Sequence, residues 1–217
     1  MESAGTPRRD PTAGERERAA EAAQVVHAGW TPADPGPLGL GAFALTTFVL
    51  SMFNADLVSK AGEPVVLGVA LAYGGIAQLL AGMWEFRTGN TFGAVAFSSF
   101  GAFWLSYWAL VTFFAAGIPE ANLGDAVGLY LIAWGIFTAY MFVASLRTTA
   151  AVALVFGLLT VTFFLLGIGN SGAHTDIVKA GGWFGLATAA AAWYASFAGV
   201  TNSTFGRTVL PVKPLNE

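Results

Sequence analysis

The polar residues that could do chemistry in this apolar chain gather where two hydrophobic stretches meet. Gln78, Glu85, Asn90 and Thr91 place amide, carboxylate and hydroxyl groups in one short stretch. Amide and hydroxyl groups can bind a small polar solute and release it again, whereas a buried arginine clamp would slow its release. Ionisable groups at bilayer depth are costly, so they mark candidate functional positions. The competing interpretation of Glu85 is a carboxylate at a span end that pairs with Arg87 or caps a helix.

Enzymatic chemistry finds no support in the rest of the sequence. Cysteine is absent, which excludes disulfides, thiolate metal sites and cysteine nucleophiles. Neither His27 nor His174 has a second ligand at metal-binding spacing. The sequence shows no Ser-His-Asp set and no pair of carboxylates placed within the membrane as acid and base. We therefore expect no catalytic site, cofactor or metal, and the lack of a basic block argues against nucleic acid.

Six apolar stretches must position the polar residues. Charged residues make up 11% of the chain, against about 25% in soluble domains, and the mean hydropathy is +0.63. A spanning helix needs about 20 mostly apolar residues. Long continuous runs rich in Ala, Leu, Phe and Gly favour helices over the alternating strands of a membrane barrel. The sequence predicts an all-α polytopic membrane protein with six transmembrane helices, near Leu38–Ala55, Val65–Trp84, Phe92–Ala116, Ala126–Leu146, Ala150–Ile168 and Ala180–Thr201.

The basic residues in the connections predict the orientation. Six spans place both termini on the same side of the membrane. Arg87, Arg147 and Arg207 lie on that side, while only Lys60 and Lys179 lie on the other. Because cytoplasmic loops carry the excess of Lys and Arg, both termini are expected to be cytoplasmic, and the protein to be integral to the plasma (inner) membrane.

The chain is expected to have three parts. Residues 1–37 are predicted to form a largely disordered cytoplasmic tail, with a helical turn or two near Glu15–Val26. This tail is too polar for the apolar region of a signal peptide. Residues 38–201 form the membrane domain, and residues 202–217 form a cytoplasmic stub. Asn202 begins a glycosylation pattern, but it falls on the predicted cytoplasmic side, so we attribute the match to chance.

Four strings of residues resemble a known family. The strings are DPGPLGLGAFALTTF at 34–48, YGGIAQLLAGMWEFRTGNTFGAVAFSSFGAFWLSY at 73–107, LGIGN at 166–170 and FGRTVLP at 205–211. In order and spacing they resemble the succinate-acetate permease family (acetate uptake transporters). The resemblance implies a six-helix protomer assembled as a homo-hexamer. It also implies one path through each subunit for acetate, other small monocarboxylates and sometimes succinate, with proton-linked uptake.

The resemblance also implies which residues form a central apolar constriction. Carried over onto matching positions, these are Phe43, Phe100 and Leu159, one from each of three spans. The family usually has Tyr at the position of Phe100, and loss of that hydroxyl makes the constriction drier. The family usually has Asn at the position of Asp34. An added carboxylate near the cytoplasmic entrance could repel anions or supply a proton site.

The apolar constriction suggests how a carboxylate would cross. A bare carboxylate loses its hydration there with nothing to replace it, and protonation removes most of that cost. We therefore expect acetate to cross as the neutral acid or with a co-moving proton, through an inner vestibule formed by Gln78, Glu85, Asn90 and Thr91. The alternatives are an acetate anion channel, a urea or short-amide channel, and a non-transporting membrane scaffold or sensor. The expected partners are a small carboxylate, protons, the lipid bilayer and further copies of the chain.

Overall fold

The computed structural model describes residues 12, 14–16, 18 and 32–215. Within the predicted tail, Glu15 and Arg16 are helical, while most of the expected helical turn at Glu15–Val26 lies outside the described residues. The chain divides into two compact units, Met1–Ala33 and Asp34–Glu217. The second unit contains all six apolar stretches.

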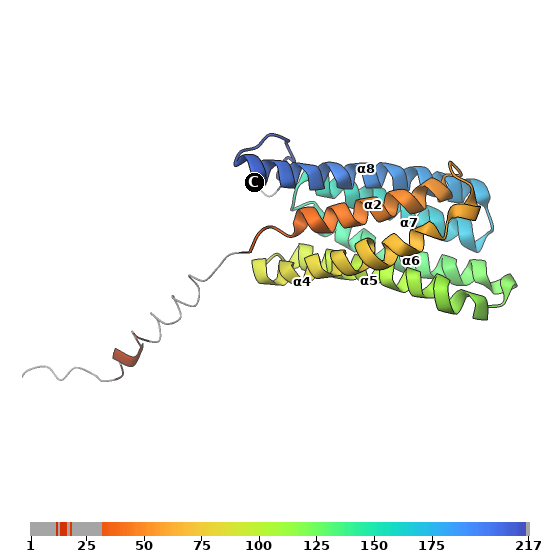
Figure 1. Cartoon of the computed structure of the whole chain (residues 1–217), viewed down its shortest axis with the longest axis horizontal. Helices are drawn as coiled ribbons and strands as arrows, with labels where there is room; N and C mark the ends of the chain where they lie inside the picture. The colour runs from red at the N-terminus through yellow and green to blue at the C-terminus, as the bar shows by residue number, and fades with distance from the viewer. Residues whose placement is uncertain (1–11, 13, 17, 19–31, 216–217) are drawn as a thin grey trace, which may run out of the picture. The chain divides into compact units, whose positions relative to one another are not determined.

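The second unit is a bundle of long helices, which confirms the predicted all-α fold (Figure 1). Its described residues contain no strand, only an isolated bridge between Thr149 and Pro214. In chain order the elements are α2 (Gly36–Asn54), η1 (Lys60–Gly62), α3 (Val65–Val69), η2 (Ala70–Ala77), α4 (Gln78–Thr88), α5 (Thr91–Ala109), η3 (Leu110–Phe114), η4 (Ala115–Gly117), α6 (Glu120–Ser145), α7 (Ala150–Ser171) and α8 (Thr175–Phe205).

Within the described residues, five helical segments are long and apolar enough to cross a membrane. They are Gly36–Asn54, Lys60–Thr88, Thr91–Gly117, Glu120–Ser145 and Ala150–Ser171. The sixth predicted span is also helical and forms α8, whose 31 residues are not among these segments. Its composition explains the difference, because α8 is rich in Ala, Gly, Ser and Thr and carries Asp176 and Lys179. That α8 spans the membrane stays a prediction.

The second and third segments are interrupted by π-helical stretches that the sequence did not indicate. η2 separates α3 from α4, and η3 follows α5. A π-helical turn holds more residues than an α-helical turn, so it changes the direction in which the following side chains point. Gln78 is the first residue after η2. The π-helical stretch therefore sets the orientation of a candidate site residue.

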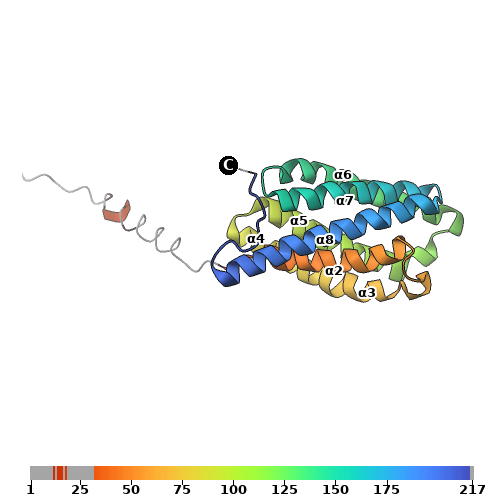
Figure 2. The ribbon, with the colours of Figure 1, turned by 90° about the horizontal axis from the view of Figure 1, so that it is seen from above.

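Small residues bring neighbouring helices close together. α8 packs beside both α2 and α7, α6 beside α7, and α4 beside α5 (Figure 2). A side chain at Gly82 of α4 would collide with Ser98 of α5. A side chain at Gly182 of α8 would collide with the backbone of Ala55 after α2. Such small contact residues are typical of helix packing in membranes.

The centre of the bundle is filled by aromatic rings. Phe100 of α5 is 2% exposed, and five other rings have centroids between 5.4 and 6.4 Å from its own. These rings come from α2, α6 and α7 and belong to Phe43, Trp134, Phe137, Phe156 and Phe163. The core around Phe100 is therefore packed and apolar.

Candidate functional site

The three residues of the expected constriction lie together in the bundle. Phe43 of α2, Phe100 of α5 and Leu159 of α7 line one narrow cavity of about 20 Å³, and each is buried. The rings of Phe43 and Phe100 lie 5.7 Å apart between centroids. A space of this size holds about one water molecule. We call these three residues the apolar ring.

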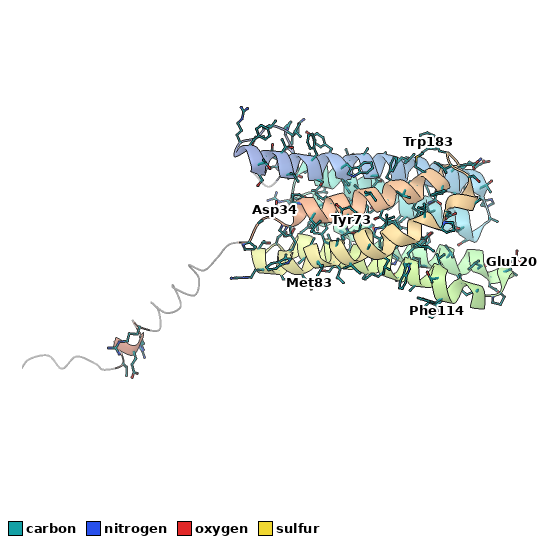
Figure 3. All side chains as sticks on the ribbon, viewed as in Figure 1. Asp34, Tyr73, Met83, Phe114, Glu120 and Trp183 are labelled. Carbon is teal, nitrogen blue, oxygen red and sulfur yellow. The ribbon has the colours of Figure 1, made fainter. Side chains whose placement is uncertain are left out.

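A larger cavity lies on each side of the apolar ring. The distal cavity, toward the end of the bundle where α2 finishes, has a volume of about 290 Å³ and shares Phe43 and Leu159 with the narrow cavity. The proximal cavity, at the end where α2 begins, has a volume of about 300 Å³ and shares Phe97 and Phe156 with it. The three cavities therefore lie in series. Asp34 and Glu120 mark the two opposite ends of the bundle in Figure 3.

Glu85 lines the proximal cavity and is 2% exposed. Its carboxylate accepts a hydrogen bond from the Thr88 hydroxyl at 3.0 Å. A side chain at position 93 would collide with this carboxylate, so Gly93 allows α5 to begin against it. Among the described side chains no basic group forms an ion pair with Glu85, and Arg87 does not pair with it. Glu85 thus lies in the cavity wall without a neutralising cation.

Asp34 and Asn90 also line the proximal cavity, each at the start of a helix. The Asp34 carboxylate accepts a hydrogen bond from the amide of Gly36 at 2.8 Å, as α2 begins. The Asn90 side chain caps α5 by accepting a hydrogen bond from the amide of Gly93 at 3.1 Å. Thr91 is exposed and does not line any of these three cavities. The expected vestibule residues are therefore spread over different depths.

Gln78 lines the narrow cavity, beside the apolar ring and outside the proximal cavity. It is the one polar side chain among the described residues around that cavity, and it is 1% exposed. Its Oε1 atom is buried and has no hydrogen-bond partner. A buried polar atom without a partner is unfavourable for folding, so it is a candidate for a functional role.

The distal cavity contains polar residues that the sequence analysis did not single out. Thr47 lies four residues after Phe43 on α2, and Trp104 lies four residues after Phe100 on α5. Residues four apart on a helix share a face, so each lies one turn beyond the apolar ring. This spacing is the sequence signal that could have found them.

The mouth at the distal end carries a pair of opposite charges. The carboxylate of Asp56 lies 2.8 Å from the ammonium of Lys179, and both side chains are about half exposed. The hydrogen bond and positive charge of Lys179 hold the pKa of Asp56 below its usual range. Lys60 and Glu63 line the same open cavity of about 540 Å³. This mouth is therefore lined by two cations and two carboxylates.

The C-terminal segment folds back over the proximal end. Asn202 Oδ1 accepts hydrogen bonds from the amides of Val209 at 2.7 Å and Leu210 at 2.9 Å, and its amide donates to the Leu210 carbonyl at 2.8 Å. The carbonyl of Lys213 accepts from the amide of Ala150 at the start of α7. Asn202 also lines the proximal cavity. Its side chain therefore has a structural role within the segment that carries the glycosylation pattern.

A bundle of long apolar helices around two cavities, which a narrow apolar ring separates, defines a helical membrane protein. Comparison with known families agrees with this class. The chain belongs to the GPR1/FUN34/yaaH family, whose model matches residues 19–217. The resemblance to succinate-acetate permeases is confirmed.

Named relatives in this family transport small solutes. The chain is 42% identical over 180 residues to the succinate-acetate/proton symporter SatP of Escherichia coli K12, covering 83% of this chain and 95% of the relative. It is 43% identical over 195 residues to acetate permease A of Emericella nidulans, covering 83% of this chain and 65% of the relative. It is 46% identical over 173 residues to ammonia transport outward protein 2 of Saccharomyces cerevisiae, covering 77% of this chain and 61% of the relative. The chain thus spans less than two thirds of these two fungal relatives.

A solved structure shares the fold. The structure of the bacterial acetate channel SatP superposes with a TM-score of 0.78 at 41% sequence identity, and the match covers 84% of this chain and 99% of that one.

Proposed function

We propose that this chain carries acetate and other small monocarboxylates across a membrane through its own helical bundle. The observation that carries the proposal is the series of three cavities with the apolar ring in the middle. The names of the relatives, acetate permease, succinate-acetate/proton symporter and acetate channel, support the same solute class. Succinate is a second candidate solute.

The apolar ring favours a solute without net charge. An acetate ion that entered it would lose its hydration shell and meet only rings and a leucine side chain in return. The neutral acid avoids most of that cost, so a proton accompanies the carboxylate through the ring. Since the narrow cavity holds about one water molecule, the ring side chains must move apart when a solute passes.

Gln78 gives the neutral acid a partner at this depth. The unpartnered Oε1 atom can accept a hydrogen bond from the hydroxyl of a protonated carboxylic acid. A carboxylate ion has no such donor and would meet the carbonyl dipole unfavourably. Glu85 and Asp34 in the proximal cavity would repel the ion and offer proton acceptors beyond the ring. Asn90 contributes an amide group to the same wall, and Thr91 lies outside it.

The proposal includes an orientation and an assembly. Arg87 lies in the last turn of α4, and Arg147 and Arg207 follow α6 and α8, all three at the proximal end, while Lys60 and Lys179 lie at the distal end. This asymmetry supports α8 as the sixth span, with the proximal end and both termini in the cytoplasm and the protein in the plasma membrane. The many exposed apolar side chains on the helices would contact lipid and neighbouring copies, and a homo-hexamer is the assembly we propose.

Uptake of labelled acetate into proteoliposomes tests the function. Uptake is measured with and without an inward proton gradient at fixed membrane potential, and protein-free vesicles are subtracted because acetic acid diffuses passively. Accumulation above the external concentration that collapses with a protonophore supports proton-coupled transport. Equilibration without accumulation indicates the channel alternative.

Parallel flux assays with urea, short amides and ammonia test the competing solutes. These neutral solutes need no proton to cross an apolar ring. If they move through the protein while acetate does not, the monocarboxylate proposal is wrong. If neither acetate nor any of these solutes moves through the protein, the chain acts as a scaffold or sensor.

A further inference from the structure

We propose that the distal cavity holds a carboxylate-binding site next to the apolar ring, formed by the Thr47 hydroxyl and the Trp104 indole N–H. The inference rests on the proposed function and adds to it the atoms that select the solute before it reaches the ring. Two residues that line this one cavity each carry a buried hydrogen-bonding group without a protein partner, and both groups are able to donate to a carboxylate oxygen.

Thr47 differs from the other buried threonines of the described residues. Each of the others donates its hydroxyl to the backbone carbonyl four residues earlier, as threonines in helices commonly do. They are Thr46, Thr138, Thr162 and Thr188, at 2.7 to 2.9 Å. Thr47 is 5% exposed, yet its hydroxyl has no hydrogen-bond partner. It is therefore a hydroxyl not committed to any protein partner, in a residue that lines the cavity.

Trp104 provides the second donor. The residue is 2% exposed, and its indole Nε1 has no partner among the described residues. An indole N–H can only donate, so it suits an anion better than a hydroxyl that can also accept. Phe103 and Tyr107 pack against the indole ring at centroid distances of 5.0 and 6.0 Å and hold it in place. A fixed donor loses little conformational freedom when it binds a solute.

Two further hydroxyls near this cavity are already occupied. Tyr130 lines the cavity, and its hydroxyl lies 2.7 Å from the Ser106 hydroxyl. Tyr130 also donates to the carbonyl of Phe103. These bonds leave them less available than Thr47 and Trp104.

The order of polar and apolar residues along the cavity selects for the shape of the solute. Phe43 and Thr47 lie one turn apart on α2, and Phe100 and Trp104 lie one turn apart on α5, both pairs running from the ring toward the distal end. A carboxylate bound at Thr47 and Trp104 directs the rest of the molecule toward the ring. A short apolar chain such as the methyl of acetate fits against Phe43 and Leu159, which line both this cavity and the narrow one. A second carboxylate placed there would lose its hydration.

Two substitutions remove the donors, and each has a matched control. Thr47→Val and Trp104→Phe each delete one hydrogen-bonding group; valine keeps the shape of threonine, and phenylalanine keeps an aromatic ring but is smaller than the indole. Thr138→Val changes a buried threonine that is outside the cavities, and Trp193→Phe changes a tryptophan that packs on Phe48. The concentration dependence of labelled acetate uptake is measured for all four in proteoliposomes. Hydrogen bonds to charged groups are strong enough that each cavity variant should raise the half-saturation concentration by about tenfold.

Thr47→Ser separates a binding role from a packing role, because it restores the hydroxyl and loses only a methyl group. Its half-saturation concentration should stay within about twofold of that of the unmodified protein. Thermal unfolding of the purified variants in detergent identifies those that fail to fold, and a folded Thr47→Ser or Trp104→Phe protein then still tests the site. If Thr47→Val and Trp104→Phe fold and saturate at the same acetate concentration as the controls, these groups bind only water and the inference is overturned.

A direct measurement of acetate binding separates the test of this site from the test of the proposed function. Saturation-transfer NMR with acetate on the detergent-solubilised protein reports occupancy without any flux. Acetate binding that is lost in Thr47→Val supports the site even if the proteoliposomes show no transport, in which case the proposed function alone fails. Transport by the unmodified protein with unchanged binding in both variants overturns the site and leaves the proposed function standing.

Discussion

The rings of Phe43 and Phe100 lie 5.7 Å apart with their planes tilted by 58°, although they come from α2 and α5. Leu159 completes the contact from α7, and the space that the three leave is about the size of a water molecule. Aromatic rings packed against one another are rigid compared with a leucine side chain, which has more rotamers. Leu159 is therefore the component of the ring whose size is easiest to change.

Leu159→Ala should widen the ring and admit larger acids. Removing one branched side chain from an apolar pocket changes discrimination by roughly 10- to 200-fold, so uptake of lactate and succinate relative to acetate should rise on the order of tenfold. Uptake of the three labelled acids into proteoliposomes measures this ratio. Leu154→Ala is the control, since Leu154 lies on α7 but is 55% exposed. Equal acid preference in the two variants would remove Leu159 from the selective ring.

Gln78→Leu should change stability and transport in opposite directions. The buried Oε1 atom has no partner, so replacing the amide by an apolar group of similar size should stabilise the protein by about 1–3 kcal/mol. The same change removes the acceptor for the protonated acid and should slow acetate uptake. Thermal unfolding in detergent and uptake at saturating acetate measure the two effects. Ser98→Ala deletes another buried unpartnered hydroxyl, away from the three cavities, and should leave uptake unchanged. Faster uptake by Gln78→Leu would show that the amide is an obstacle.

The helices could be predicted from the sequence, but the depth of the site residues could not. Continuous apolar runs indicate helices because each must satisfy its backbone groups internally in lipid. The π-helical stretch before Gln78 has no such signature, and it decides whether that amide meets the ring or the proximal cavity. Thr91 lies beside Asn90 in sequence, yet only Asn90 lines the proximal cavity, because Asn90 is the non-helical cap and Thr91 is the first residue of α5, so their side chains point in different directions.

Contacts between residues that lie far apart in the sequence could not be predicted from hydropathy either. Hydropathy alone does not distinguish Phe43, Phe100 and Leu159 from the other apolar residues of their helices, and only the resemblance to the family indicates that these three form one constriction. The C-terminal segment reads as a polar stub, but its backbone hydrogen bonds to Asn202 depend on how α8 finishes.

Asp56→Asn should weaken the distal end in a pH-dependent way. Because Lys179 lowers the pKa of Asp56 in the folded protein, the ion pair contributes stability above the ordinary carboxyl pKa, and this contribution is lost as the pH falls through the lowered value. The Tm of the variant should therefore be slightly lower than that of the unmodified protein at neutral pH and equal to it in strong acid. Thermal unfolding across this pH range at low salt measures the difference, which should shrink in high salt.

The same substitution should affect acetate capture. Loss of the carboxylate leaves Lys179 without its counter-ion at the mouth and removes one negative charge that repels anions. Uptake at low acetate concentration and low ionic strength should increase, and salt should reduce the gain. Asp125→Asn removes an exposed carboxylate from α6 that is not part of this mouth and serves as the control. A similar gain in both variants would indicate an effect of net charge alone.

Asn202→Ala should release the C-terminal segment from the proximal end. The substitution removes three hydrogen bonds between one side chain and the backbone of Val209 and Leu210, which should cost about 1–3 kcal/mol of local stability. The segment also satisfies the amide of Ala150 at the start of α7, so loosening it exposes that helix end. Hydrogen exchange of the Val209, Leu210 and Ala150 amides should become faster. Ser203→Ala changes the exposed neighbouring residue and should leave the exchange of all three as it is. Unchanged exchange in Asn202→Ala would mean that the other bonds of the segment hold it in place, namely the hydrogen bond from Tyr194 to the carbonyl of Pro211 at 2.7 Å and the backbone bonds around the start of α7.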